Sequence, residues 1–361
     1  MQLRGGSSKG AYFLADDLPA DPGERDDLLL RILGSPDERQ IDGIGGGHPL
    51  TSKVAVIRRS RDARADVDYV FLQVVPGRPI VTDAQTCGNL LAGVGPFAIE
   101  RGLVAARDGT TGVRIRIMNP TVGFAEARVS TPGGRVRYDG DTLMAGTPFP
   151  AAGIRLEFPG GDAPLFPTGR LVEELAGVEV TCVNAGMPVV LVRAADLGID
   201  GDEPPETLEG DRGLRSAIEA IRLAAGPAMG HGDVRDSTVP KITIVSPPRR
   251  GGTVTTRTFI PHRVHAAIGV LGGVSVAAGV LSPGTVASAP PTAALSAGTV
   301  VGEPPPAGSL VRIEHPSGVF DVHLYLDGGG AETRLRRSAV VRTARKLSDG
   351  LVWPRSGKAI G

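Results

Sequence analysis

Residues 87–102 read CGNLLAGVGPFAIERG, and residues 264–281 read VHAAIGVLGGVSVAAGVL. Each stretch is long enough for a helix, and neither carries a polar face along its apolar part. A helix without a polar face has to be enclosed by protein. One such segment lies in each half of the chain, after several segments of strand character. We therefore predict an α/β (α+β) fold of two similar domains, 1–178 and 179–361, each a curved mixed sheet wrapped around a central buried helix.

The rest of the chain consists mainly of short apolar runs between turn residues. Gly (51) and Pro (30) are both frequent, which indicates many short strands. Strands are predicted at residues 11–14, 54–58, 69–75, 112–118, 123–129, 153–158, 188–192, 241–245, 253–259, 309–313 and 320–325. Leucine or isoleucine at helical spacing predicts surface helices at 22–33, 167–175 and 213–225. The Ala-, Pro-, Ser- and Thr-rich stretch 281–308 is interpreted as an extended surface loop.

Composition narrows the class of function. Lys plus Arg number 39 and Asp plus Glu number 39, so no basic surplus is present to neutralise a phosphate backbone, and we expect no nucleic-acid partner. The apolar run 266–281 is shorter than the ~20 residues that span a bilayer, so no membrane association is expected. The two cysteines, Cys87 and Cys182, have no disulfide or zinc-ligand pattern, which favours a reducing cytoplasm. A homodimer is expected because a chain of many strands has edges to cover.

The start of the first apolar helix is the first candidate for a reactive site. Cys87, Gly88 and Asn89 stand where unpaired backbone N–H groups and the positive end of the helix dipole would meet a carboxylate or an enolate. The same field favours the thiolate of Cys87, which could then act as a base. The alternative is that Cys87 is a small buried apolar residue.

A triple-glycine segment leads to the second candidate. Residues 45–53 read GGGHPLTSK and place Ser52 and Lys53 at the start of a predicted strand. The chain contains five lysines and 34 arginines, so a lysine at position 53 departs from its strong preference for arginine. This favours chemistry that needs a deprotonable amine. The alternative is a surface lysine that begins a strand.

Two further groups of polar residues could bind an anion. Residues 4–10 read RGGSSKG, and they offer a carboxylate the side chains of Arg4, Ser7, Ser8 and Lys9. The second group precedes the second apolar helix and comprises Arg257, His262, Arg263 and His265. Positive groups at a helix N-terminus gain nothing from the dipole, so a bound anion would compensate them. The alternative for residues 4–10 is a flexible turn without a role, and the alternative for the second group is a set of solvated charges in a loop. No third ligand accompanies the two histidines, so no metal is expected.

Read in order, these motifs resemble the PrpF family of isomerases that act on tricarboxylates. The matching segments are RGGSSKGAYF, DERQIDGIGGGHPLTSKVAV, TCGNLLAGVGPFAIERGLV, VNAGMPVVLV and RTFIPHRVHAAIGVLGGVSVA. The resemblance covers nearly the whole chain. It implies a diaminopimelate epimerase-like fold and proton transfer next to a carbonyl or carboxylate, without a cofactor or metal.

The resemblance also implies roles for particular residues. Lys53 in TSK and Cys87 in CGN match the catalytic acid/base pair of the family. Epimerases of the wider fold use two cysteines, one per domain, but the second apolar helix begins HRVHAA and offers none, which favours a Lys/Cys pair. The residues expected to bind the substrate are Arg4, Ser7, Ser8, Lys9, Ser52, Gly88, Asn89, Asn184, Gly186, Met187, Arg257, His262, Arg263 and His265.

The activity that the resemblance implies is keto–enol tautomerisation of the small tricarboxylate 4-oxalomesaconate, in gallate breakdown. One of Lys53 and Cys87 would remove a proton from the activated carbon or enol oxygen, and the other would return one to a different atom. The alternative within the family is a 1,3-allylic isomerase of a related acid such as methylaconitate or aconitate. Two other classes stay open: a cysteine hydrolase with Cys87 as nucleophile and His265 as base, and a non-catalytic anion-binding protein.

Overall fold

A computed structural model describes residues 1–84, 87–120, 122–235, 237–288 and 309–358. The chain divides into unit 1, which comprises Met1–Phe158 and Val341–Gly361, and unit 2, which comprises Pro159–Val340. This division differs from the domains expected at 1–178 and 179–361. Residues 159–178 lie with unit 2, and the C-terminal segment returns to unit 1. The return follows from the long strand β16 (Arg334–Ser348), whose last residues pair with the first strand of the chain.

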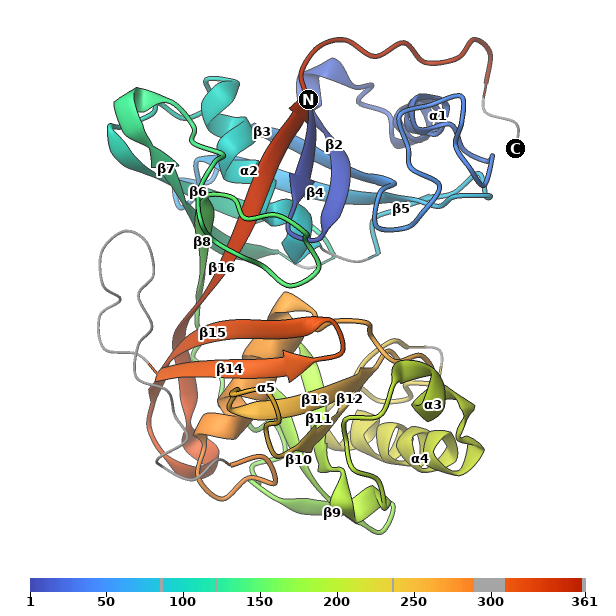
Figure 1. The fold of residues 1–361 in the computed structure, drawn as a ribbon, viewed down its shortest axis with the longest axis vertical. Helices are drawn as coiled ribbons and strands as arrows, with labels where there is room; N and C mark the ends of the chain where they lie inside the picture. Colours follow the sequence, from blue (N-terminus) through green and yellow to red (C-terminus); the bar gives the residue numbers. More distant parts are fainter. Residues whose placement is uncertain (85–86, 121, 236, 289–308, 359–361) are drawn as a thin grey trace. The chain divides into compact units, whose positions relative to one another are not determined.

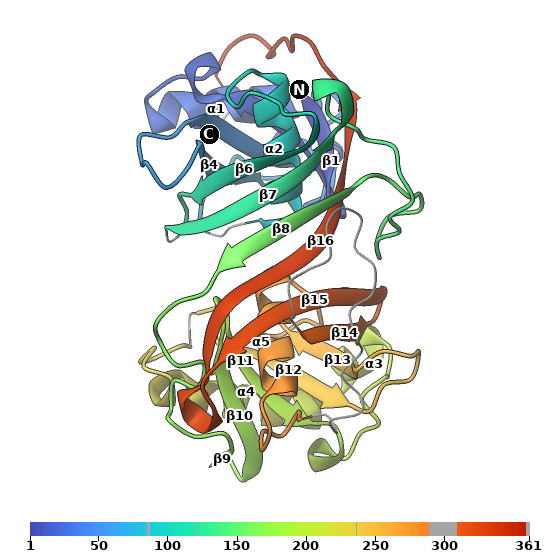
Figure 2. The same ribbon diagram turned by 90° about the vertical axis from the view of Figure 1, so that its left-hand side faces the viewer.

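Unit 1 is a closed barrel of strands. The order is β16-β1-β2-β3-β4-β6-β7-β8, and β8 lies next to β16 again (Figures 1 and 2). The elements of unit 1 are β1 (Gln2–Gly5), β2 (Ser8–Leu14), α1 (Pro22–Leu33), β3 (Lys53–Arg59), β4 (Val67–Val74), β5 (Val81–Thr82), α2 (Gly88–Glu100), β6 (Gly109–Ile117), β7 (Gly123–Thr131) and β8 (Gly153–Pro159). Helix α1 matches the prediction at 22–33 and packs outside the barrel, where Leu29 and Leu33 join Val54 and Leu72 in one core cluster.

Helix α2 fills the inside of the barrel of unit 1. Its residues from Leu90 to Ile99 are all buried, as predicted for a helix without a polar face. Gly93 permits this close packing, because a Cβ atom there would lie 2.4 Å from the hydroxyl of Tyr12. The helix begins at Gly88, one residue after the predicted start, since Cys87 has an extended backbone and serves as the N-cap.

Unit 2 also wraps strands around a buried helix, α5, and the first part of β16 is one of these strands. The strand order is β16-β15-β14-β13-β12-β11-β10-β9. The elements are β9 (Glu173–Leu175), β10 (Val178–Asn184), β11 (Pro188–Arg193), α3 (Pro205–Gly210), α4 (Arg212–Ala228), β12 (Lys241–Ser246), β13 (Val254–Phe259), α5 (Val270–Leu281), β14 (Ser309–His315) and β15 (Gly318–Asp327). Helix α4 matches the prediction at 213–225, and its Ile218 and Ile221 pack on Ile242 and Ile244 of β12.

Two predicted elements of unit 2 differ from the structure, and a third lies largely outside the described residues. The helix predicted at 264–281 begins only at Val270, because the residues before it pair with β13. Val264 forms a β-bridge with Phe259, and the N–H of His265 donates to the backbone carbonyl of Thr258. The helix predicted at 167–175 is wrong. Gly169, at φ +71°, turns the chain there, and β9 follows. Of the loop predicted at 281–308, residues 289–308 lie outside the described part of the chain.

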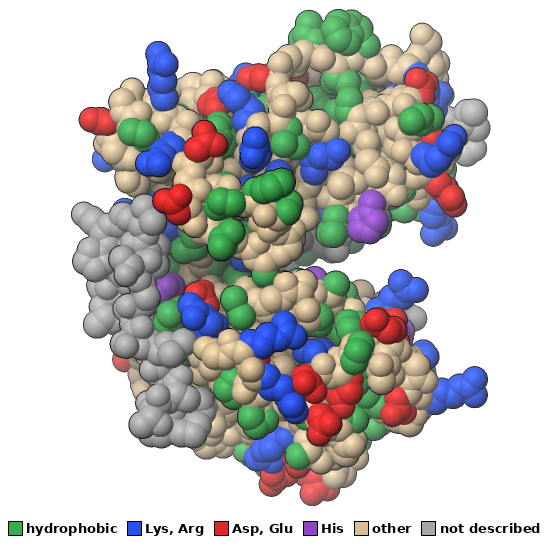
Figure 3. Space-filling model, viewed as in Figure 1, with side chains coloured by type: hydrophobic (Ala, Val, Ile, Leu, Met, Phe, Trp, Pro, Cys, Tyr) green, Lys and Arg blue, Asp and Glu red, His purple; other side chains and the backbone are tan. Residues whose placement is uncertain are grey.

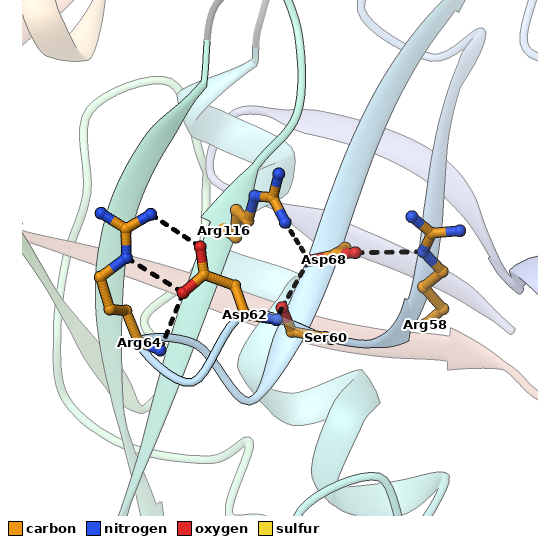
Figure 4. A network of polar contacts seen from close by, with 6 residues as sticks. All are labelled: Arg58, Ser60, Asp62, Arg64, Asp68 and Arg116. Atoms are coloured by element: carbon orange, nitrogen blue, oxygen red, sulfur yellow. Dashed lines mark hydrogen bonds and ion pairs between the residues drawn. The ribbon is translucent and has the colours of Figure 1, made fainter.

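A buried carboxylate ties three strands together on the outer face of the barrel of unit 1 (Figure 4). Asp68 of β4 is 2% exposed and accepts hydrogen bonds from Arg58 Nε at 3.1 Å and Ser60 Oγ at 2.7 Å. Its neighbour on β6 is Arg116, whose Nη1 lies 4.0 Å away. Because side chains alternate along a strand, this outward position of Asp68 turns Tyr69 towards the inside of the barrel.

On the face shown in Figure 3, neither positive nor negative side chains predominate. Lys and Arg side chains lie among Asp and Glu side chains in both units (Figure 3), in agreement with the formal charge of zero. Among the described residues, none of the helices combines the length and the apolar character needed to cross a membrane.

Candidate active site

Lys53 is a buried lysine whose partner is a neutral amide. It is the first residue of β3 and only 7% exposed. Its Nζ donates to Gln73 Oε1 at 2.8 Å and lies 5.0 Å from the centroid of the Phe71 ring. Lysines this buried usually have an anionic partner. Within the described residues, Lys53 has the amide and the ring face instead.

Gln73 is held so that its carbonyl oxygen must face Lys53. Its Nε2 donates to the backbone carbonyls of Ser52 at 2.9 Å, Val74 at 3.1 Å and Pro49 at 3.2 Å. An amide flipped by half a turn would bring its oxygen against these acceptors. The backbone around the 45–53 segment therefore fixes the direction from which Lys53 is bound.

Cys87 caps the N-terminus of α2 through its side chain. Its Sγ accepts from the N–H of Leu90 at 3.5 Å, and its carbonyl oxygen accepts from the hydroxyl of Tyr69 at 3.3 Å. Cys87 is 9% exposed. Burial, and then the neighbouring Cys87, raise the pKa of Tyr69 well above its ordinary value, so this phenol remains a hydrogen-bond donor at neutral pH. The thiol sits at the positive end of the helix dipole, as the sequence predicted.

One face of β4 joins these two residues. Tyr69, Phe71 and Gln73 alternate along the strand, so they share the inner face of the barrel. Tyr69 binds Cys87, while Phe71 and Gln73 contact Lys53. The Cα atoms of Tyr69 and Gln73 are about 13 Å apart at the usual rise of a strand. One face of β4 therefore contacts both residues, the amine of Lys53 near the end of the strand and the backbone carbonyl of Cys87 near its start.

The β1–β2 hairpin turn packs on the start of α2. Asn89 Nδ2 donates to Ser7 Oγ at 3.1 Å. Gly6, at φ +54°, approaches so closely that a Cβ atom would lie 2.3 Å from Asn89 Oδ1. Ser8 is 2% exposed, and its Oγ has no hydrogen-bond partner among the described residues. Ser7 and Asn89 are thus in direct contact, and Ser8 and Gly88 are their neighbours in the chain.

Two other predicted site residues of unit 1, Arg4 and Ser52, bind protein atoms, whereas the side chain of Lys9 stays available. Arg4 Nη1 donates to the carbonyl of Gly6 at 2.9 Å and to the carbonyl and hydroxyl of Thr343 at 2.9 and 2.8 Å, which fixes the hairpin to β16. Ser52 is buried, and its Oγ donates to Gln40 Oε1 at 2.5 Å. The backbone N–H of Lys9 donates to the backbone carbonyl of Leu50 at 2.9 Å, and the side chain of Lys9 is partly exposed.

The turn between β10 and β11 in unit 2 resembles the β1–β2 turn. Asn184 Oδ1 accepts from the N–H of Gly186 at 3.1 Å, and Gly186 has φ +103°. Ser275 of α5 donates its hydroxyl to the carbonyl of Met187 at 2.7 Å. The expected residues Asn184, Gly186 and Met187 therefore form one turn against the central helix of unit 2.

The predicted cluster of Arg257, His262, Arg263 and His265 does not form one group. Arg257 is 3% exposed, and its guanidinium nitrogens donate to the backbone carbonyls of Asp202, Glu203 and Thr256, so it braces a loop. His262 is exposed, with Nδ1 3.9 Å from Glu219 of α4. Arg263 is also exposed. His265 alone is partly buried, because it continues β13 towards α5.

Sequence reasoning missed the residues that support Lys53 and Cys87. The sequence predicts a strand at 69–75 but gives Gln73, Phe71 and Tyr69 no part in the site. Their alternation was visible, but their partners depend on the register of β3 against β4, in which Lys53 lies opposite Gln73. Among the described residues, no group of three or more His, Cys, Asp or Glu side chains could hold a metal ion.

Comparison with known proteins identifies the family. The model of the PrpF protein family matches residues 1–354. Over 356 residues the chain is 51% identical to a Pseudomonas putida protein named 4-oxalomesaconate tautomerase, covering 97% of this chain and 94% of that protein. Over 359 residues it is 50% identical to a Novosphingobium protein named (4E)-oxalomesaconate Delta-isomerase, covering 98% and 96%.

A solved structure shares the fold. The crystal structure of a methylitaconate-delta-isomerase superposes with a TM-score of 0.81 at 30% identity, covering 97% of this chain and 93% of the other. The predicted diaminopimelate epimerase-like fold, with one enclosed helix in each unit, is confirmed. The chain is therefore an isomerase and belongs to the PrpF protein family.

Proposed function

We propose that this isomerase catalyses the keto–enol tautomerisation of 4-oxalomesaconate, with Lys53 and Cys87 as its acid/base pair. The observation that carries the assignment of the pair is the inner face of β4, which contacts Lys53 through Gln73 and Phe71 and Cys87 through Tyr69. The substrate is supported by two relatives, at 51% and 50% identity, whose names refer to oxalomesaconate.

The reaction needs one proton to leave and one to return. One of the pair takes the proton from the enol oxygen or the activated carbon, and the substrate becomes a dienolate. The other then gives a proton to a different atom, so the product has the same atoms and charge as the substrate. The amine of Lys53 is held by the uncharged amide of Gln73. The start of α2 places its dipole beside the charge that develops.

The carboxylates of the substrate require donors in addition to the acid/base pair. In unit 1 we assign this role to Ser7, Ser8, Lys9 and the backbone N–H groups of Gly88 and Asn89. The buried, unpartnered hydroxyl of Ser8 among the described residues supports this choice. In unit 2 the candidates are Asn184, Gly186, Met187, His262, Arg263 and His265. Arg4, Ser52 and Arg257 are assigned to the fold, because their polar groups bind protein atoms.

A second candidate function is 1,3-allylic isomerisation of the same or a related tricarboxylate, such as methylaconitate or aconitate. The relatives named Delta-isomerase, one of them known by its crystal structure, favour it. The same pair would act, but the proton would leave one carbon of an allylic system and return to another. Hydrolysis through Cys87 and His265 is not proposed, since the relatives are named isomerases.

The test is to mix the protein with 4-oxalomesaconate in deuterated buffer and to follow ultraviolet absorbance and proton NMR together. Tautomerisation predicts faster enol–keto conversion than in buffer alone. Deuterium at an allylic carbon with a shifted double bond would favour the second candidate. A conversion rate equal to that of buffer would contradict the proposed substrate, and the aconitate series would then be tested.

The wider setting is also a proposal. We place the enzyme in the cytoplasm, in gallate breakdown, as a homodimer without a nucleic-acid partner. Both cysteines are free thiols, as expected in a reducing compartment.

A further inference from the structure

The internal repeat gives Lys241 the position in unit 2 that Lys53 has in unit 1. In unit 1, β2 runs parallel to β3, and the first residue of β3, Lys53, pairs with Gly10. In unit 2, β11 runs parallel to β12, and the first residue of β12, Lys241, pairs with Val189. In each unit this second strand then pairs antiparallel with the next one, β4 or β13, which precedes the central helix.

Both lysines lie on the face that looks towards the central helix. A Cβ atom on Gly10 would meet Leu90 of α2 at 2.9 Å, and Lys53 is the register partner of Gly10. In unit 2, Leu191 reaches α5, where a Cβ atom on Gly279 would meet it at 2.3 Å. Val189 shares a face with Leu191, so its partner Lys241 does too.

The beginning of β12 also lies beside the first turns of α5. The turn that precedes β11 is bound there, because Ser275 donates to the carbonyl of Met187 and accepts from the N–H of Ala185 at 3.0 Å. On the same face of β12 as Lys241, the hydroxyls of Thr243 and Thr258 lie 2.9 Å apart. The helix-facing side of unit 2 is therefore polar at this end.

The charge of Lys241 has no acidic partner within the described part of the chain. Its Nζ donates to the backbone carbonyl of Thr238 at 3.0 Å. Burial lowers the pKa of Lys241, and burial together with the charge of Lys241 lowers the pKa of His265. His265 Nδ1 accepts from the N–H of Ala267 at 2.9 Å, so the proton of the neutral ring is on Nε2. The N–H of His265 donates to the carbonyl of Thr258, and the hydroxyl of Thr258 contacts that of Thr243, which shares a face of β12 with Lys241. Lys241 and His265 therefore border the same polar patch, and neither forms an ion pair among the described residues.

Lys241 differs from Lys53 in the residue that lies opposite it on the neighbouring strand. Lys53 lies opposite Gln73, whereas continuation of the β12–β13 register sets Lys241 opposite Ile260, which has no side-chain acceptor. A lysine held only by a loop carbonyl can donate its remaining hydrogens to a ligand, which suits binding better than controlled proton transfer.

We propose that Lys241 and His265 form a carboxylate-binding subsite of unit 2, which takes one carboxylate group of the tricarboxylate substrate. This subsite rests on the proposed function for its natural ligand. It assigns a lysine that the motifs did not single out, and it explains why two of the five lysines of the chain begin equivalent strands.

The experiment measures binding of propane-1,2,3-tricarboxylate, which has no double bond to move, by calorimetry with the full chain. Lys241→Met should weaken binding by about tenfold or more, since it removes a charged hydrogen bond. Lys241→Arg should retain more affinity than Lys241→Met. Lys358→Met is the matched control, because Lys358 is exposed and its loss changes the net charge equally.

Affinity of Lys241→Met within twofold of the wild type, at an unchanged melting temperature, would overturn the subsite. If Lys241→Met does not fold, Lys241→Gln is judged by the same limits, since its amide can still donate to the carbonyl of Thr238. With an active substrate, Lys241→Met should raise KM and leave kcat within a few fold. The binding measurement does not depend on turnover. If the proposed reaction is wrong, the wild type will not convert 4-oxalomesaconate, and this result is separate from the outcome of the binding test.

Discussion

Gln73 accepts the hydrogen bond of the Lys53 ammonium at 2.8 Å and gives its own amide hydrogens to three backbone carbonyls. A group held in this way can position an amine without adding charge to it. Gln73 is therefore a positioning residue for Lys53, and its substitution should affect catalysis more than folding.

Gln73→Leu should lower kcat by up to about 100-fold, because an amine displaced by about 1 Å loses its alignment with the substrate. Gln73→Glu should move the activity profile to higher pH, since a carboxylate favours the protonated amine. Steady-state kinetics over a pH series checks both. Gln2→Leu is the control, because Gln2 also donates to a backbone carbonyl of unit 1, that of Ile44 at 3.1 Å. Equal kcat for Gln73→Leu and Gln2→Leu would refute the positioning role.

The two cysteines should differ in reactivity. Cys182 is fully buried, and burial, with the neighbouring Glu173, raises the pKa of its thiol. Cys87, the N-cap of α2, is 9% exposed and is therefore the more accessible of the two thiols. Iodoacetamide should inactivate the native enzyme with one label, at Cys87, as shown by mass spectrometry of peptides. Label on Cys182 before Cys87 would contradict this. Cys87→Ser retains an N-cap and should fold, but should lose activity.

The approach of the β1–β2 turn to α2 should not tolerate a side chain at Gly6. Gly6 and Gly133 have nearly the same φ, +54° and +60°, but a Cβ atom at Gly133 would meet nothing within 4 Å. Gly6→Ala should therefore be less stable than Gly133→Ala by about 1–3 kcal/mol, the usual cost of overpacking. Urea unfolding of the two variants measures the difference. Equal stabilities would mean that the contact with Asn89 is not tight.

Alkaline pH should destabilise the protein through Tyr12 and Tyr69. Burial, and then the neighbouring Cys87, raise the pKa of both phenols well above the ordinary value. The unfolded chain loses these protons near pH 10 while the folded chain retains them. Their contribution to stability is therefore complete below about pH 10 and falls above it, by about 1.4 kcal/mol per pH unit for each tyrosine. Tyr69→Phe should show a shallower fall in the free energy of unfolding. The same slope in variant and wild type would contradict the assignment.

The apolar helices and most strands could be predicted because their signal is local. An apolar stretch without a polar face must be enclosed, and both such stretches are the central helices α2 and α5. The strand β16 was missed because its sequence, RLRRSAVVRTARKLS, is rich in arginine, and its burial depends on strands far away in the chain.

Of the candidate site, only the local geometry could be predicted. The sequence places Cys87 and Asn89 at the start of α2, since a helix N-terminus is set by neighbouring residues. The partners of Lys53 were not, because they follow from the register of β3 against β4. Arg257 looked like an anion ligand in the sequence, but the loop at Asp202 folds over it and uses its guanidinium group.

The most direct test of the acid/base pair is the rate of 4-oxalomesaconate conversion by Lys53→Met and Cys87→Ser, each compared with the wild type at equal folding. Loss of a general acid or base lowers rates by 10²–10⁴-fold, so each variant should fall by about 1000-fold while binding of propane-1,2,3-tricarboxylate stays within about tenfold. Turnover by either variant within a few fold of the wild type would show that this residue does not transfer the proton.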